Sequence, residues 1–347
     1  MPFECSDFHK QFERGVVMLS LDTEQIWGYL DLLNDQQFQH QYPGAPDAHT
    51  KLLGCLTSAG VSATWFLVGG LTLAGSEGPR DKRMRGLPAE WVNRIRGGDE
   101  ATAPLWYQRS FVEKLREADP FQEIGLHGGL THFIWTDASA TPDVLKSELS
   151  EGVKALAQAH VRPLSFSFGR EQEAHHALLP LHGIRCYRGR TVSPAFQFGP
   201  TIYGKIARLF DELRRATPLP VWPQEVQPGL WNIPSSLFLY PIRASRTAVA
   251  GLPSRIERFN RGVAAAVRSR GIFHFCLHPE NLTESPHGIS LFEEMLERLV
   301  IDRDRGDIEI LTMSEVTARM ERARDRQWEA IAGVLPRPVR GVVEPAF

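Results

Sequence analysis

The chain has no long hydrophobic run, little cysteine and no excess of either charge. No apolar stretch in its 347 residues approaches the ~20 residues that a membrane-spanning helix requires. Lys and Arg total 39 against 41 Asp and Glu, so the composition does not predict a partner that is a nucleic acid or an anionic membrane. The four cysteines are scattered without a CxxC pair, which indicates reduced thiols rather than a disulfide framework.

Internal repeats and low-complexity tracts are also absent, and nothing in the sequence predicts an oligomeric state. The first residues lack the basic start and apolar core of a signal peptide, so we expect a cytoplasmic protein. A hydrophobic content of 42% and a charged content of 23% are typical of a soluble globular protein.

Short apolar runs alternate with longer helical patterns along most of the chain. Most of these runs lack strict alternation, as expected for strands that are buried on both faces. The runs are 15–21, 62–68, 123–126, 164–168, 183–187, 231–234, 272–277 and 308–311, and the main helical patterns are 111–118, 143–159, 254–269 and 290–303. This alternation predicts an α/β fold, and we favour a distorted (β/α) barrel of seven or eight mainly parallel strands over an open sheet.

The domain organisation predicted from these patterns is one barrel with additions. We expect residues 1–316 to form the barrel, with a long insertion over 71–120 and a second, aromatic-rich excursion over 193–222. The excursion's aromatics, which include Phe196 and Phe198, fit a cleft lining or ordinary core packing equally well. Residues 317–347 form the C-terminal helix and tail, and Ser314 is a plausible N-cap for that helix.

Two carboxylates and two histidines follow predicted strand ends. Asp22 and Glu24 come after the first apolar run, where one can bind a cation and the other can act as a general base, although Asp22 could also cap a helix. His127 and His132 straddle a Gly-Gly pair at the end of another run. Neutral imidazole is the commonest metal ligand in proteins, but buried histidines that serve only as hydrogen-bonding groups are equally common.

Two further clusters follow later strand ends. Arg170 comes after the run 164–168, where it can orient a carboxylate and depress its pKa, or simply pair with Glu173 at the surface. His175 and His176 follow it, and at most one of them can face a site because adjacent helical residues point in different directions.

The last cluster belongs to the run 272–277. His278 stands at the mouth of this run, where it can protonate a leaving amine. His274 lies deeper in the run and is more simply explained as a buried, hydrogen-bonded core residue. Since α/β barrels keep their chemistry at the carboxyl ends of their strands, the four clusters together predict a hydrolytic metal site.

The order of these motifs resembles the polysaccharide deacetylases of the NodB-homology type, carbohydrate esterase family 4, over about residues 15–316. Ser-Leu-Asp22-Thr-Glu24 is similar to the family's Thr-Phe-Asp-Asp motif, and Glu123-Ile-Gly-Leu-His127 through His132 resembles its metal motif. The segments 63–69, 166–170, 277–279 and 312–316 resemble the other conserved elements of the family in the same order.

The resemblance implies a distorted barrel that uses a divalent ion, with zinc as the expected one, to hydrolyse an acyl group on a sugar. It implies that Asp22 is the general base, that His127 and His132 bind the metal, and that His278 is the general acid. Arg170 would then hold Asp22 ionised and aligned.

Two departures from the family pattern bear on the metal. Thr23 stands where the family has its second Asp, so we assign that ligand role to Glu24. The spacing between the histidines is one residue longer than usual, so either the Gly-Gly loop absorbs the extra residue or the metal site is altered or lost.

We therefore expect a metal-dependent hydrolase that removes an N-acetyl or N-formyl group from an amino-sugar-containing small molecule or glycan. Two alternatives stay open. One is a hydrolase of the same fold that acts on a non-sugar amide or ureide. The other is a non-catalytic carbohydrate-binding protein with a degenerate metal site.

Overall fold

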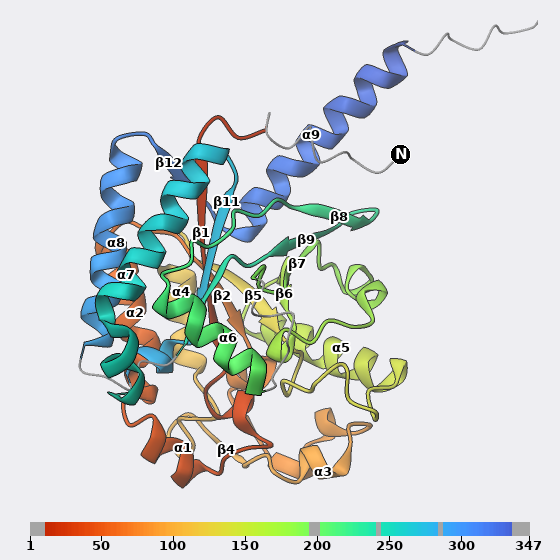
Figure 1. The fold of residues 1–347 in the computed structure, drawn as a ribbon. Helices are drawn as coiled ribbons and strands as arrows, with labels where there is room; N and C mark the ends of the chain where they lie inside the picture. Colours follow the sequence, from red (N-terminus) through yellow and green to blue (C-terminus); the bar gives the residue numbers. More distant parts are fainter. Residues whose placement is uncertain (1–10, 194–201, 241–243, 284–286, 335–347) are drawn as a thin grey trace, which may run out of the picture.

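The computed structural model of the protein describes residues 11–193, 202–240, 244–283 and 287–334 (Figure 1). Its strands are β1 (Gly15–Thr23), β2 (Thr64–Leu67), β3 (Gly75–Ser76), β4 (Gly98–Asp99), β5 (Glu123–His127), β6 (Ser165–Ser167), β7 (Cys186–Gly189), β8 (Gln224–Gln227), β9 (Leu230–Pro234), β10 (Leu237–Leu239), β11 (Ile272–Leu277) and β12 (Ile308–Ile310). Its α-helices are α1 (Asp35–Gln41), α2 (Ala45–Ser58), α3 (Ala89–Val92), α4 (Arg109–Glu117), α5 (Pro142–Gln158), α6 (Ile202–Leu213), α7 (Ala244–Ser269), α8 (Gly288–Asp304) and α9 (Met313–Val334).

Ten strands form one curled sheet in which β8 alone, within the described residues, runs antiparallel to its neighbour. The strand order is β10-β11-β1-β2-β5-β6-β7-β9-β8, and β12 pairs with the first residues of β1 before β2 joins it. The predicted distorted, mainly parallel barrel is therefore confirmed, with more strands than the seven or eight expected. Because the parallel strands share one direction, their carboxyl ends meet at one end of the barrel.

The two faces of β1 pack against different parts of the core. Val17, Leu19 and Leu21 are buried on the outer side, in the large cluster that the surrounding helices complete. Val16 and Met18 alternate with them and point into the barrel. Every residue of β1 is buried, which explains why its sequence is a continuous apolar run rather than an alternating one.

Helix α9 closes the barrel at the amino ends of its strands. Its first turns contribute Met313, Val316 and Met320 to the inner core, and all three side chains are fully buried. The amide of Met313 also donates to Thr64 Oγ1 at the start of β2, at 3.0 Å. The carboxyl ends of the strands, where α/β barrels carry their functional groups, lie at the opposite end.

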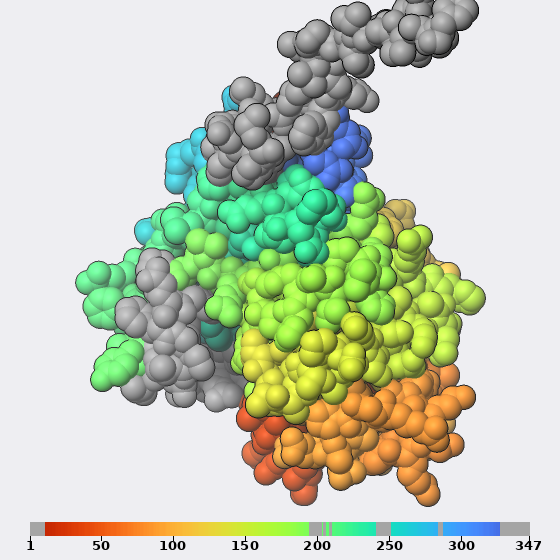
Figure 2. Space-filling model, turned by 90° about the vertical axis from the view of Figure 1, so that its right-hand side faces the viewer, coloured from red at the N-terminus to blue at the C-terminus, as the bar shows by residue number. Residues whose placement is uncertain are grey.

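The segment 71–120 follows the carboxyl end of β2 and carries α3, α4 and the two-stranded pair β3–β4. In the space-filling view its orange residues gather at one end of the molecule, next to the yellow and green residues that follow it in sequence (Figure 2). Buried Trp106 and Tyr107 from this segment pack edge-on against Trp27, which ties it to the chain that leaves β1.

All eight apolar runs overlap strands, and the helices predicted over 111–118, 143–159 and 290–303 are present with shifts of one or two residues at their ends. The helix predicted over 254–269 begins ten residues earlier, at Ala244, and has a kink at Gly251. The predicted N-cap is wrong. Helix α9 begins at Met313, and Thr312 and Glu315 form the reciprocal cap: Thr312 N donates to Glu315 Oε2 at 2.8 Å, and Glu315 N donates to Thr312 Oγ1 at 3.4 Å.

Some predictions fall outside the described residues. Phe196 and Phe198 of the aromatic-rich excursion are among these, as are Cys5 and the tail after residue 334. Within the part of the chain that the structure describes, no helix is long and apolar enough to cross a membrane.

Candidate active site

Five of the six predicted site residues come together with Arg188 at the carboxyl ends of four strands. Asp22 is the penultimate residue of β1 and Glu24 follows that strand directly, while His127 is the last residue of β5. Arg188 lies near the end of β7, and His278 follows β11. The register pairs Asp22 with Phe66 of β2 and His127 with Ser167 of β6, so the strand ends lie side by side.

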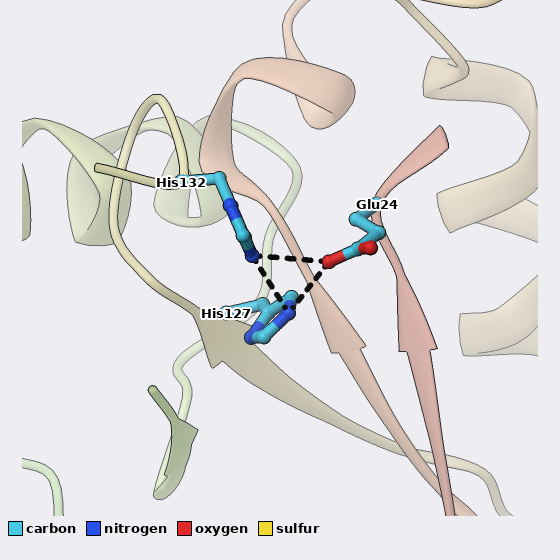
Figure 3. Close-up of side chains that lie close together, drawn as sticks. All are labelled: Glu24, His127 and His132. Carbon is cyan, nitrogen blue, oxygen red and sulfur yellow. Dashed lines mark hydrogen bonds and ion pairs between the residues drawn. The ribbon is translucent and has the colours of Figure 1, made fainter. Parts of the chain in front are cut away.

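Glu24, His127 and His132 direct one atom each to a common centre (Figure 3). Glu24 Oε2 lies 2.9 Å from His127 Nε2 and 3.0 Å from His132 Nε2, and the two nitrogens are 3.2 Å apart. All three residues are buried. Ligands of a tetrahedral zinc ion at ~2.0–2.1 Å lie about 3.3 Å from one another, so this triangle has nearly the size that such an ion requires.

The donor atoms of this triangle suit a cation. His127 Nδ1 lies 3.0 Å from the carbonyl oxygen of Ser167, which can only accept, so Nδ1 carries a hydrogen and Nε2 is the ring nitrogen that faces the triangle. Burial lowers the pKa of His132, which favours its neutral ring as well. When both rings present lone pairs here, the two nitrogens and the carboxylate oxygen repel one another at about 3 Å, and a cation between them removes that repulsion. The donor set of two histidines and one glutamate fits a divalent metal.

The Gly-Gly pair accounts for the longer spacing between the histidines. Gly128 and Gly129 have φ values of +70° and +143°, and His132 itself has a φ of +62°. These left-handed conformations fold the loop back, so that both imidazoles face Glu24 despite the additional residue. The loop thus absorbs the extra residue and keeps the three donors together.

Asp22 is held by a buried arginine beside the triangle. Arg188 Nη2 donates to Asp22 Oδ2 at 2.5 Å, and both side chains are almost fully buried. Burial would raise the pKa of Asp22, but Arg188, His127 and His278 together outweigh it, so the pKa lies well below the ordinary value. Asp22 Oδ1 has no hydrogen-bond partner among the described residues, which leaves an ionised oxygen available to take a proton.

A chain of hydrogen bonds fixes Arg188 in turn. Its Nη1 donates to Ser20 Oγ at 3.2 Å, and that hydroxyl donates to His274 Nε2 at 2.9 Å. His274 Nδ1 donates to the carbonyl of Pro234 at 3.0 Å. Burial and the charge of Arg188 lower the pKa of His274 to about 3, so the ring is neutral and its Nε2 accepts the hydrogen bond from Ser20. The interpretation of His274 as a hydrogen-bonded core residue is therefore confirmed.

The arginine that contacts Asp22 differs from the predicted one. Arg170 pairs with Asp31, and its side chain is 34% exposed. It follows β6 in a short turn in which Arg170 and Glu171 both have left-handed φ values, and this turn directs it away from Asp22. Neither the contact with Asp22 nor the alternative pairing with Glu173 is observed. The only sequence signal for Arg188 was its position directly after the predicted strand 183–187.

The helix-cap alternative for Asp22 is also wrong, because the residue lies within β1 and faces Arg188. His175 and His176 do not reach the triangle. His175 is exposed, and His176 lies 3.2 Å from Glu173 and packs on Phe168 and Tyr187.

His278 bridges the two carboxylates. Its Nε2 lies 3.4 Å from Asp22 Oδ2, and its Nδ1 lies 3.1 Å from Glu24 Oε1 and 3.6 Å from Glu280 Oε1. Burial alone would lower the pKa of His278, but the charge of Glu24 and the hydrogen bond to Asp22 raise it well above the ordinary value. The ring therefore carries a proton that it can donate.

These groups open into a cavity of about 210 Å³. Asp22, Glu24, His127 and His278 lie in its wall, and Arg170, Glu171, Arg188, Phe238 and Tyr240 complete the lining. Phe238 packs edge-on against His278, with the ring centres 5.2 Å apart. A small polar substrate with one apolar face could therefore reach both the candidate base and the candidate acid.

The fold is shared with enzymes of known structure. No protein-family model matches the chain, and no curated protein matches it by sequence. Among solved structures, a protein from Mycobacterium smegmatis that is provisionally assigned as a polysaccharide deacetylase is 17% identical, with a TM-score of 0.55 over 100% of this chain and 98% of its own.

Two other structures are similar over nearly as much of the chain. A protein from Pseudomonas aeruginosa PAO1, also provisionally assigned as a polysaccharide deacetylase, is 11% identical, with a TM-score of 0.58 over 91% of this chain and 93% of its own. PuuE allantoinase is 10% identical, with a TM-score of 0.54 over 88% and 89%. At these identities the similarity establishes the fold, and the expected polysaccharide-deacetylase fold is confirmed.

Proposed function

We propose that the protein is a metal-dependent hydrolase that removes an N-acetyl or N-formyl group from an amino-sugar-containing substrate. The observation that carries the proposal is the position of the Glu24, His127 and His132 triangle beside an ionised carboxylate and a protonated imidazole. The shared fold with proteins assigned as polysaccharide deacetylases supports the same class of reaction.

Glu24, His127 and His132 would hold the divalent ion, and zinc is the first candidate because two histidines and a glutamate are a known catalytic zinc set. Such an ion lowers the pKa of water towards ~7 and polarises an acyl oxygen. Asp22 Oδ1 takes a proton from the attacking water, while Arg188 holds the other carboxylate oxygen and fixes its direction.

His278 supplies the second proton transfer. Its Nε2 faces Asp22 and the cavity, so it can donate to the nitrogen of the leaving amine as the C–N bond breaks. Nδ1 stays between Glu24 and Glu280, which fixes the ring's orientation. Phe238 packs against the ring edge-on and limits its rotation.

Elemental analysis together with two variants tests this proposal. We expect about one divalent ion per chain in the wild type and none in His127→Ala/His132→Ala. Asp22→Asn should keep the ion and lose at least about 100-fold in turnover of N-acylated amino sugars, because general-base catalysis contributes ~10²–10⁴-fold. Retained activity in both variants would exclude the mechanism, and a wild type that binds no metal after reconstitution would favour a binding role.

A ureide or cyclic amide is the second candidate substrate class, because PuuE allantoinase shares the fold. The proposed roles of Asp22 and His278 apply equally to such a C–N bond. A panel that sets N-acetyl and N-formyl amino sugars against allantoin and related ureides separates the two classes by kcat/KM. Turnover of the ureides alone would replace the sugar assignment and leave the metal site intact.

A further inference from the structure

Helix α5 presents a carboxylate where its packing pattern calls for an apolar residue. Leu145, Leu149, Gly152 and Leu156 are buried on one face of the helix, and Glu148 lies on that same face with no exposed surface. A buried carboxyl group is costly unless hydrogen bonds compensate for it. Its partners therefore indicate what it does.

All the partners of the Glu148 side chain belong to the loop that carries His132. Glu148 Oε1 accepts from the backbone N–H of Thr131 at 2.6 Å, from the hydroxyl of Thr131 at 2.9 Å and from the backbone N–H of Phe133 at 3.3 Å. One oxygen thus binds the residues on both sides of His132. Glu148 Oε2 has no partner among the described residues.

The backbone that this oxygen binds adopts an unfavourable conformation. The φ of +62° at His132 lies in the left-handed region, which a residue with a side chain adopts at a cost. Gly129 leaves room for the carboxylate, since a Cβ atom there would lie 2.5 Å from Glu148 Cγ. Other hydrogen bonds hold the loop before His132, such as Gly70 N to the carbonyl of Leu130 at 2.6 Å, but the bonds to Glu148 hold the residues on both sides of His132.

We propose that Glu148 is a positioning residue that holds His132 in its metal-binding orientation, an inference that rests on the proposed metal site. The longer spacing between the two histidines makes this support necessary, because neither β5 nor a helical turn fixes His132 directly. The chemistry is that of an outer partner whose loss weakens metal binding through the ligand it orients.

Four proteins test the inference through zinc affinity, measured by competition with a chromophoric chelator, and through the visible absorption spectrum of the cobalt(II) form. Glu148→Ala should lower zinc affinity about 10- to 100-fold and alter the cobalt spectrum. Glu148→Gln keeps an acceptor at the same reach, so it should retain most of the affinity. Burial raises the pKa of Glu148 to about 7, so a neutral amide is a close substitute near neutral pH.

Glu148→Asp keeps the carboxyl group but places its oxygens one methylene further from the loop, so it should behave like the alanine variant. The glutamine and aspartate variants together therefore test whether Glu148 positions His132, even if Glu148→Ala does not fold. The matched control is Glu123→Ala, another buried carboxylate, whose partners are Thr64 Oγ1 and Ser314 N at the far end of the barrel. It should lower the melting temperature and leave zinc affinity unchanged.

Unchanged zinc affinity and an unchanged cobalt spectrum in folded Glu148→Ala or Glu148→Asp would overturn the role of Glu148 and leave the proposed function standing. Equal losses in Glu123→Ala and Glu148→Ala would also overturn it, since the effect would then be general destabilisation. A wild type that binds neither ion would instead refute the proposed metal site itself.

Discussion

Two arginines near the site differ in what their loss should cost. Arg188 is buried against the buried carboxylate of Asp22, whereas Arg170 is partly exposed and pairs with the partly exposed Asp31. Removing one partner of a buried pair leaves an unpaired charge in the interior, but exposed pairs contribute little because water screens them. Arg170 follows β6 and Arg188 lies in the neighbouring parallel strand β7, so they form a natural comparison.

We expect Arg188→Met to lower the free energy of unfolding by about 3–5 kcal/mol and Arg170→Met by less than about 1 kcal/mol. Urea titrations of the two variants measure both values. If Arg170→Met proved to be the costlier variant, the assignment of Arg188 as the partner of Asp22 would be wrong.

The sequence alone predicted five of the six residues that form the candidate site, and it missed Arg188. Asp22, Glu24, His127, His132 and His278 each follow or end an apolar run, and such runs are readable because buried parallel strands are continuously hydrophobic. Arg188 was missed because two arginines follow strand ends. Only the left-handed turn at Arg170 and Glu171 decides which one faces Asp22, and non-glycine residues give no warning of such turns.

Among the elements, the strands that the sequence analysis missed are short or polar. β10 has three residues, and β8 alternates exposed and half-buried side chains at an antiparallel edge, so neither forms an apolar run. The N-cap of α9 was predicted wrongly for a different reason. Thr312 and Ser314 both have cap-forming side chains, and the choice depends on where Glu315 reaches back.

The cap of α9 can be tested directly. Thr312→Ala removes the acceptor for Glu315 N and the hydroxyl that donates to the Glu315 carboxylate at 3.0 Å, so we expect a loss of about 0.5–2 kcal/mol in the free energy of unfolding. Ser314→Ala should cost less than about 0.5 kcal/mol, because Ser314 lies inside the helix. Chemical denaturation of both variants compares them, and the opposite ranking would restore Ser314 as the cap.

At the scale of the whole molecule, a buried neutral histidine makes the free energy of unfolding depend on pH. His49 of α2 is buried, and its Nδ1 donates to Gln108 Oε1 at 2.8 Å. Its Nε2 lies 3.4 Å from the amide nitrogen of Gln25, which is a donor and so favours the unprotonated ring. Burial lowers the pKa of His49 from 6.5 to about 4.

Between pH 6.5 and about 4 the unfolded chain binds a proton at His49 that the folded protein does not. Stability therefore falls as the pH drops through this window, by roughly 3 kcal/mol for this residue at 1.36 kcal/mol per pKa unit. Urea unfolding at pH 7 and pH 4.5 should show a smaller difference for His49→Gln than for the wild type. Equal differences would mean that His49 does not contribute.

Helix α9 fills one end of the barrel with Met313, Val316 and Met320, and for the proposed hydrolase this has a kinetic consequence, because the candidate catalytic groups lie at the other end. In the proposed reaction, substrate and both products use the same opening, because the side chains of α9 fill the other end of the barrel. A deacylated product that has not yet departed then blocks the next substrate molecule. Steady-state rates should accordingly show product inhibition that is competitive with substrate, and catalysis at high turnover would be limited by how quickly that single entrance clears.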